Sequence, residues 1–292
     1  MRVLFATDGQ PPARRAQKLL ESMGRRDGTE VKVITVAFDD DPRPEDWNRS
    51  GIKEAEQVSE LAAAELRSAG FDAVAIRQGG SPADEILQAI DDYDIDLTVL
   101  GSGHRSWLGN LILGSVSTHV LHSSPSGVLI VNEWLQEARK VRVLVGVDGS
   151  DHAMHATELL ASFADPERCN VTIIGVAPYA QPALVVHAAL APAYEPWDAG
   201  HQEDLIKRAG MRVARARRVL DDAGFKTSAL TNVGSPSSVL LKEVDSHRMD
   251  LVVVGSRGLG PVRRTMLGSV SNNVARHAPA TLVGRERGLN RE

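Results

Sequence analysis

The chain contains two copies of one unit, and this duplication constrains its fold more than any other feature. The segment VLFATDG at 3–9 matches VLVGVDG at 143–149, an offset of 140 residues, and GSVS at 114–117 recurs at 268–271, an offset of 154. Self-similarity over nearly the whole chain indicates that one folding unit has been repeated. A length of 292 residues fits two domains of ordinary size.

The difference between the two offsets places an insertion of 14 residues in the second copy. It falls in the segment 178–200, which is rich in Pro and Ala and is predicted to be a long loop. Its apolar residues make it a candidate lid or partner surface, and a loop packed on its own domain is the alternative. The polar stretch NEWLQEARK at 132–140 joins the copies, so we predict domains at 1–138 and 139–292.

Strand-like and helix-like segments alternate within each copy. Short runs rich in Val, Ile and Leu, such as RVLFAT, VKVITV and DLTVLG, are separated by stretches with helical spacing such as EAEQVSELAAAELRSAG. This alternation predicts parallel β-α units whose helices cover both faces of a sheet. The expected fold class is α/β: two tandem doubly wound domains, each a five-stranded, mainly parallel sheet with helices on both faces.

Charge and hydropathy exclude several classes of function. The net charge is −5 and the pI is near 6.0, which argues against a nucleic-acid binder or an anionic-membrane binder. No stretch approaches the roughly 18 apolar residues of a membrane helix, and the first residues lack a signal-peptide hydrophobic region. We therefore expect a cytoplasmic protein with no membrane partner. The single cysteine, Cys169, precedes an apolar strand and is expected to be a structural thiol rather than a nucleophile.

A glycine-rich loop recurs after the fourth predicted strand of each copy. It reads GSRGLGPVRRTMLGSV at 255–270 and GSGHRSWLGNLILGSV at 101–116. In open α/β sheets, ligands bind at the carboxyl ends of the strands. Glycines let a ligand approach the backbone there, and the exposed N–H groups of a helix start suit an anion. Asp148 ends the first strand of the second copy and reaches the same edge, so the arrangement predicts a nucleotide site with a carboxylate for the ribose.

The better-known phosphate loops are absent from the sequence. There is no GxxxxGK[ST] segment, and the glycines follow the fourth strand, whereas a dinucleotide-binding GxGxxG follows the first. The sequence also shows no Ser-His-Asp order and no general base beside the loop. The pair His152 and His155 has helical spacing, but without a third ligand metal binding is the lesser interpretation. No catalytic residue and no metal site are predicted.

The second loop resembles the nucleotide loop of the universal stress protein A family, whose pattern is Gly, two residues, Gly, nine residues, Gly and then Ser or Thr. The resemblance extends over both copies and includes the strand-ending aspartate, the GSP before the third helix and the GSVS helix start. It implies that Gly255, Gly258, Gly268 and Ser269 hold phosphates and ribose, while Asp148 contacts the nucleoside. It also implies that Val176 presents its backbone to adenine.

The resemblance also assigns a complete set of cofactor-binding residues. In the second copy these are Val147, Asp148, Gly149, Val176, Gly255, Arg257, Gly258, Arg264, Gly268, Ser269, Val270 and Ser271. In the first copy they are Asp8, Val36, Gly101, Gly114 and Ser115. The implied cofactor is ATP, with ADP and AMP as alternatives and Mg²⁺ accompanying the nucleotide.

The family likeness implies a regulatory nucleotide-binding protein of the stress response rather than an enzyme. A scaffold that binds no nucleotide and a weak ATPase are the alternatives. The likeness further implies that the last strands, GVLIVN and PATLVG, pair the two copies within the chain. We also expect the whole chain to form a homodimer.

The first loop departs from the family pattern. His104 stands where the second copy has Gly258, and a β-carbon there hinders the close approach of a phosphate. The positions of Arg263 and Arg264 are occupied in the first copy by Gly109 and Asn110. We therefore expect the second site to bind ATP better, and the first to be weak, shifted or vacant.

Overall fold

The structure, a computed structural model, describes residues 1–24, 27–37, 45–102, 104–105, 111–133, 139–178, 199–258 and 267–285. For residues 45–52, 104–105, 111–112 and 199–201 it describes the backbone alone. The predictions for Arg264 and for nearly all of the insertion, 179–198, lie outside these residues. The side chain of His104 lies outside them as well.

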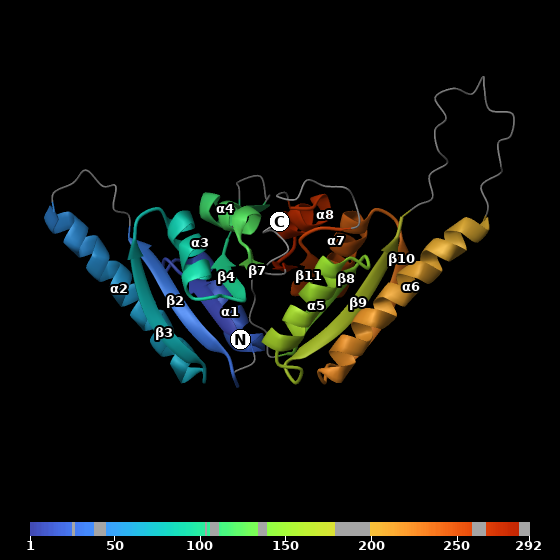
Figure 1. The fold of residues 1–292 in the computed structure, drawn as a ribbon, viewed down its shortest axis with the longest axis horizontal. Helices are drawn as coiled ribbons and strands as arrows, with labels where there is room; N and C mark the ends of the chain where they lie inside the picture. Colours follow the sequence, from blue (N-terminus) through green and yellow to red (C-terminus); the bar gives the residue numbers. More distant parts are fainter. Residues whose placement is uncertain are drawn as a thin grey trace, which may run out of the picture.

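Each half of the chain is a run of alternating strands and helices (Figure 1). The first half consists of β1 (Arg2–Ala6), α1 (Pro11–Met23), β2 (Glu30–Ala37), α2 (Glu45–Ser68), β3 (Asp72–Gly79), α3 (Pro82–Asp92), β4 (Leu97–Gly101), β5 (His104–Arg105), β6 (Leu111–Ile112), α4 (Ser115–Ser123) and β7 (Gly127–Val131). The second half consists of β8 (Val141–Val147), α5 (Asp151–Phe163), β9 (Cys169–Ala177), α6 (Ala199–Asp222), β10 (Thr227–Val233), α7 (Pro236–His247), β11 (Leu251–Gly255), α8 (Ser269–His277) and β12 (Ala280–Gly284).

The strands of both halves form one ten-stranded sheet in the order β10-β9-β8-β11-β12-β7-β4-β1-β2-β3. Within this sheet, all strand pairs inside one half are parallel, which confirms the predicted five-stranded doubly wound units. The halves join through β7 and β12, which pair antiparallel with Leu129 opposite Leu282. The predicted pairing of the two last strands is therefore confirmed. A two-stranded hairpin, β5-β6, follows β4 and was not predicted.

Helices cover both faces of the sheet and bury its strands. Side chains of α1, α2, α5 and α6 pack into one apolar core, and those of α3, α4, α7 and α8 pack into the other. Both cores contain residues of both halves, so each is continuous across the β7-β12 seam. The central strands β7, β11 and β12 are buried at every residue, as expected for strands covered on both faces. The edge strand β10 is mostly exposed.

The seam between the halves is held by two reciprocal helix caps. Asn132, directly after β7, donates from Nδ2 to the carbonyls of Ala275 (2.8 Å) and Ala278 (2.9 Å) at the end of α8. Arg285, directly after β12, donates to three carbonyls at the end of α4, those of Leu121, His122 and Ser124. Helix ends leave carbonyls unpaired, so each half supplies a donor to the last helix of the other.

Arg285 is buried beside these carbonyls with 8% of its surface exposed. Burial and, to a lesser extent, the nearby charge of Arg257 together lower the pKa of Arg285 to about 10. The negative end of the α4 dipole favours the guanidinium at this place. In the described part of the chain, no helix combines the length and the apolar character that crossing a membrane requires.

Candidate functional site

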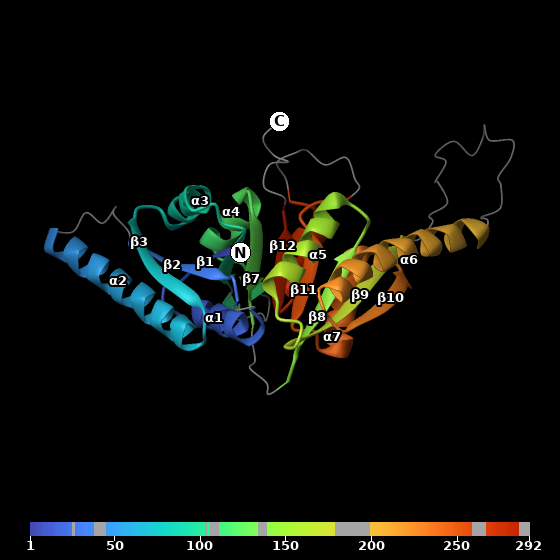
Figure 2. The same ribbon diagram turned by 60° about the horizontal axis from the view of Figure 1, so that its bottom comes forward.

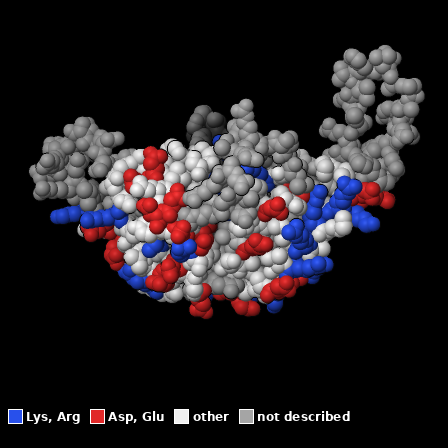
Figure 3. All heavy atoms as spheres, in the orientation of Figure 1, with Lys and Arg blue, Asp and Glu red and all other residues white. Residues whose placement is uncertain are grey.

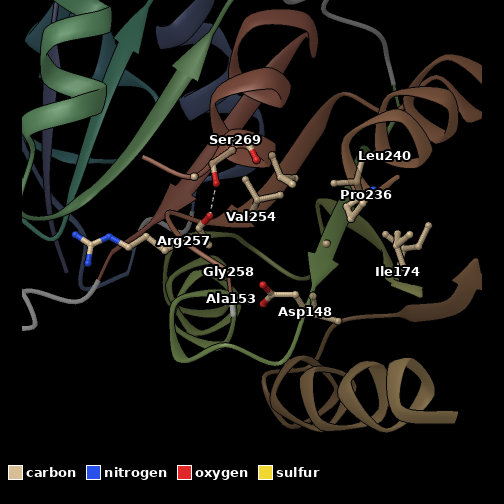
Figure 4. A pocket seen from close by; sticks show the side chains of 16 residues that line it. Asp148, Ala153, Ile174, Pro236, Leu240, Val254, Arg257, Gly258 and Ser269 are labelled. Carbon is tan, nitrogen blue, oxygen red and sulfur yellow. Dashed lines mark hydrogen bonds between the residues drawn. The ribbon is translucent and has the colours of Figure 1, made fainter. Parts of the chain in front are cut away.

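A cavity of about 220 Å³ opens in the second half at the carboxyl ends of β8, β9 and β11 (Figure 4). In the sheet, β8 lies between β9 and β11, and the chain crosses from β10 at the edge back past β8 to β11. The cavity therefore lies where the strand order reverses, the usual ligand crevice of a doubly wound sheet. The lining residues are Gly146, Val147, Asp148, Ala153, Ile174, Val176, Pro236, Leu240, Val254, Gly255, Arg257, Gly258, Gly268, Ser269, Val270 and Ser271. The structure thus brings ten of the twelve residues predicted for the second site to one cavity.

Asp148 is the carboxylate of this cavity, and one of its oxygens is fixed by the next turn. Its Oδ1 accepts hydrogen bonds from the backbone N–H of Ser150 (3.0 Å) and from the Ser150 hydroxyl (2.6 Å). The same hydroxyl also lies 3.2 Å from the carbonyl of Arg257 and accepts from the N–H of Ala153 at the start of α5. Ser150 therefore ties the β8 loop to the glycine loop and leaves Oδ2 of Asp148 directed toward Gly258.

Gly258 is closely packed against this second oxygen. A β-carbon built at Gly258 would lie 2.5 Å from Oδ2 of Asp148, well inside ordinary contact distance. Any side chain here would displace the end of the Asp148 side chain, whereas glycine leaves the carboxylate in place. The Asp148 carboxylate and the backbone of Gly258 therefore lie opposite each other at the cavity. The absence of a side chain at Gly258 lets a ligand come close to the backbone.

The start of α8 closes the opposite side of the cavity. The N–H of Gly268 donates to the carbonyl of Ser256 (2.8 Å), and the Ser271 hydroxyl donates to the carbonyl of Gly255 (2.6 Å). These bonds hold the first turn of α8 against the end of β11. The first N–H groups of a helix have no partner within the helix, and Ser269 adds an exposed hydroxyl beside them. The positive end of the helix dipole makes this place suited to an anion.

The rest of the wall is apolar, and sequence reasoning missed it. Ile174 and Gly146 lie two positions before Val176 and Asp148 on their strands, so they share a face of the sheet with them. The alternation of strand residues was the signal that could have found them. Leu240, one helical turn after the first residue of α7, packs over Gly146. The cavity therefore combines a flat apolar floor with a polar rim.

Two predicted residues of the second site that the structure describes do not reach into the cavity in the predicted way. The Arg257 backbone lines the cavity, but its guanidinium points away from it, toward the first half (Figure 4). Gly149 lies just outside the lining, with φ of 86° and the side chain of Arg212 packed over it. Arg264 lies outside the described residues.

His152, which was considered as a metal ligand, lies behind the glycine loop. Its Nδ1 is 3.4 Å from the Ser256 hydroxyl, whereas Nδ1 of His155 is 3.6 Å from a carboxylate oxygen of Glu158. Burial and the positive charges of Arg257 and Arg285 lower the pKa of His152. The imidazole is therefore mainly neutral at pH 7, and the two histidines face different partners.

A second cavity, of about 370 Å³, lies at the equivalent place in the first half. All five residues predicted for the first site line it: Asp8, Val36, Gly101, Gly114 and Ser115. Asp8 is exposed, and Gln10 stands where the second half has Ser150. Among the described residues, the backbone N–H of Gln10, 2.9 Å away, is the one donor to the Asp8 carboxylate. In this half His104 lies in β5, where the loop forms a hairpin.

Comparisons with known proteins agree with the duplication. The model of the universal stress protein family matches residues 1–132 and again 141–283. A putative universal stress protein of Staphylococcus aureus is 29% identical over 144 residues, 48% of this chain and 81% of that protein. A universal stress protein of Archaeoglobus fulgidus has a similar structure over 98% of both chains, with 25% identity and a TM-score of 0.70. A putative universal stress protein of Pseudomonas aeruginosa shares the fold, with 15% identity, a TM-score of 0.60, and coverage of 99% of this chain and 94% of that one.

Proposed function

The chain belongs to the universal stress protein family, and we propose that it is an ATP-binding regulatory protein of the stress response whose second half holds the nucleotide. The observation that carries this proposal is the convergence on one cavity of Asp148, the glycine backbone at Gly255 and Gly258, and the start of α8. These groups come from three separate elements, and packing alone does not require a carboxylate opposite unpaired helix N–H groups.

The residues present fit an adenine nucleotide part by part. The first N–H groups of α8, with Gly268 and Ser269, would receive phosphates, since anions bind where helix N–H groups are unpaired. Oδ2 of Asp148 would accept a hydrogen bond from a ribose hydroxyl, because Oδ1 is already engaged by Ser150. The apolar floor of Ile174, Leu240 and Val176 would take the base, with the Val176 backbone at its edge. Mg²⁺ would accompany the phosphates and neutralise part of their charge.

The cavity supports binding rather than turnover. Among the lining residues that the structure describes, Asp148 and Arg257 are the only ionisable ones, and the Arg257 guanidinium points away. General-base catalysis needs a proton acceptor within reach of the attacking water. Asp148 is held by Ser150 at the nucleoside side of the cavity, opposite the α8 start proposed for the phosphates.

The proposed site is connected to the seam between the halves, which gives binding a route to regulation. The N–H of Ser256, at the start of the glycine loop, donates to the carbonyl of Gly284, the residue before Arg285. A nucleotide that orders this loop would thus act on the strand end from which Arg285 caps α4. Such a ligand shifts the equilibrium between arrangements only by its difference in affinity for them.

The test is to count nucleotide and then remove each carboxylate in turn. We expect the purified chain, once denatured, to release about one adenine nucleotide, and calorimetry to show one ATP site per stripped chain. Asp148→Ala should weaken ATP binding by at least tenfold, whereas the matched variant Asp8→Ala in the first half should leave it within about twofold.

Two results would contradict the proposal. If Asp8→Ala lost ATP binding while Asp148→Ala kept it, the ATP site would lie in the first half. No released nucleotide, together with no heat on adding ATP, ADP or AMP, would favour the scaffold without nucleotide. ATP hydrolysis that Asp148→Ala abolishes would instead favour the weak ATPase.

A further inference from the structure

The two halves of the chain carry opposite charge, although they share one fold. Residues 1–138 contain 13 Lys and Arg against 22 Asp and Glu, a net charge of −9. Residues 139–292 contain 20 against 16, a net charge of +4. The modest charge of the whole chain, −5, hides this asymmetry. The first half of the chain is therefore acidic and the second half basic.

The basic charge of the second half is concentrated on the outer face of α6 (Figure 3). We call this face the α6 stripe; it consists of Lys207, Arg208, Met211, Arg212, Arg215 and Arg218. The helix carries no acidic residue between Asp204 and Asp221. Among the described residues, none of the five cations of the stripe takes part in an ion pair, whereas Arg217 beside them is paired with Asp221 at 3.1 Å. Met211 lies in the middle of the stripe and is 60% exposed.

Helix α2 provides an internal control for the α6 stripe. The two helices have the same length, pack against the same face of the sheet and align at the offset of 154. Where α6 has Arg208, Arg212, Arg215 and Arg218, α2 has Glu54, Val58, Leu61 and Ala64. The first half folds without these cations, so the fold does not require them. Their accumulation on one exposed face points to something outside the domain.

The outer face of α2 is complementary to the α6 stripe. It carries a shallow groove, which we call the α2 groove, lined by Lys53, Glu56, Gln57, Glu60, Leu61 and Ala64. Leu61 in this groove is 57% exposed, and Glu54, Glu56, Glu60 and Glu65 are exposed on the same helix. Glu56 and Glu60 make exposed ion pairs with Arg77 and Arg67, and such solvent-screened pairs contribute little and can exchange partners. An apolar centre framed by acidic residues thus matches an apolar centre framed by basic ones. Protein interfaces have this anatomy, whereas a nucleic-acid backbone gains nothing from an exposed methionine.

We propose that the α6 stripe binds the α2 groove of a second copy of this chain. The two faces lie at opposite ends of the long axis of the molecule and both face outward (Figures 1 and 2). One molecule therefore cannot pair its own stripe with its own groove. The contact is heterologous, head to tail, and leaves a free stripe at one end of the assembly and a free groove at the other. Such contacts continue to longer assemblies unless they close into a ring.

The test blocks each end separately and measures mass by sedimentation over a range of concentrations. The wild-type chain should associate beyond a dimer as concentration rises, and 0.5 M NaCl should weaken the association, since exposed charges are screened by salt. The double variant Arg208→Glu/Arg215→Glu should abolish binding through the α6 stripe by reversing part of its charge. The double variant Glu54→Lys/Glu60→Lys should do the same for the α2 groove. Each variant alone should be mainly monomeric, with its dissociation constant raised on the order of tenfold or more.

The sharpest measurement is the mixture of these two variants. Each retains the end that the other lacks, so the mixture should form dimers and nothing larger. Lys226→Glu/Lys242→Glu changes the charge of the second half by the same amount away from the stripe, and it should associate like the wild type. Circular dichroism and thermal unfolding establish that each variant is folded.

Several outcomes would overturn the proposal. A wild-type chain that stays monomeric at every concentration, or that forms only a dimer which neither double variant disrupts, excludes the contact. A mixture of the two variants that does not dimerise excludes the head-to-tail arrangement. Binding of a DNA duplex or of anionic vesicles through Arg208 and Arg215, with no self-association, would show that the stripe has a different partner.

Discussion

Replacing Gly258 by alanine tests whether the carboxylate of Asp148 touches the nucleotide. The new β-carbon would lie 2.5 Å from Oδ2 of Asp148, whereas carbon and oxygen atoms approach without strain to about 3.4 Å. The carboxylate must therefore move by about 1 Å, against the hydrogen bonds that Ser150 makes to Oδ1. A hydrogen bond to a charged group contributes about 1.5–3 kcal/mol. Its loss raises the dissociation constant for ATP by about 10- to 150-fold.

The assay is calorimetric titration of stripped protein with ATP, with thermal unfolding as a measure of the fold. The matched control is Gly114→Ala in the first half, where a new β-carbon meets no atom of the described residues within 4 Å. We expect Gly114→Ala to bind ATP like the wild type in the second site. If Gly258→Ala also binds normally while Asp148→Ala does not, then Oδ2 is not the oxygen that contacts the ligand and the assignment of the ribose is wrong.

Three further predictions concern stability. Arg285→Ala removes the donor to three carbonyls at the end of α4, and we expect the free energy of unfolding in urea to fall by about 2–4 kcal/mol; a change below about 0.5 kcal/mol would show that these carbonyls are satisfied otherwise. Gly255→Ala places a β-carbon 2.6 Å from the backbone nitrogen of Ala153, so α5 must shift and unfolding should become easier by about 1–3 kcal/mol; an unchanged melting temperature would contradict the close approach. Burial raises the pKa of Cys169 from 9.0 to about 12, so the thiol ionises more readily in the unfolded chain. Below pH 9 it therefore adds no pH dependence to the free energy of unfolding. Between pH 9 and 12 the free energy of unfolding of the wild type should fall by up to about 1.4 kcal/mol per pH unit more than that of Cys169→Ala. If the free energies of unfolding of the two proteins fall in parallel with pH, the raised pKa is disproved.

The sequence predicted the fold well because the duplication made its signals redundant. Each strand and helix appeared twice, and the offsets of 140 and 154 fixed which segments correspond. The pairing of β7 with β12 followed from the family likeness alone, since nothing in two apolar runs specifies an antiparallel contact between domains. The β5-β6 hairpin escaped prediction because its strands have two residues each, too short for an alternating pattern.

The candidate site was predicted unevenly for a physical reason. Residues that end strands or begin helices, such as Asp148 and Ser269, were found because parallel strands bring their carboxyl ends to one edge. The apolar floor was missed because Ile174 and Leu240 look like any other core residues in sequence. The orientation of Arg257 could not be predicted either, since a long side chain next to a glycine has many rotamers and the sequence does not specify which one is adopted.

Positions where the two copies differ show which side chains the shared fold requires and which occur in one half alone. Gly9 and Gly149 both have positive φ, at 73° and 86°, and each is covered by the same turn of the following long helix. In the first half the covering residue is Val58, and in the second it is Arg212. A valine suffices to pack the loop, so the charge of Arg212 is an addition to the second half alone.

Arg212 belongs both to the α6 stripe and to the surroundings of the proposed nucleotide site. It packs on Gly149, and Gly149 follows the carboxylate that we assign to the ribose. A partner that draws Arg212 toward its own acidic groove would therefore change the support of the Asp148 loop. Linkage then requires the reverse effect: if self-association changes the affinity for ATP by some factor, ATP changes the association constant by the same factor. Sedimentation with and without saturating ATP measures this coupling, and Arg212→Val, which restores the residue of the first half, should abolish it while leaving the loop packed.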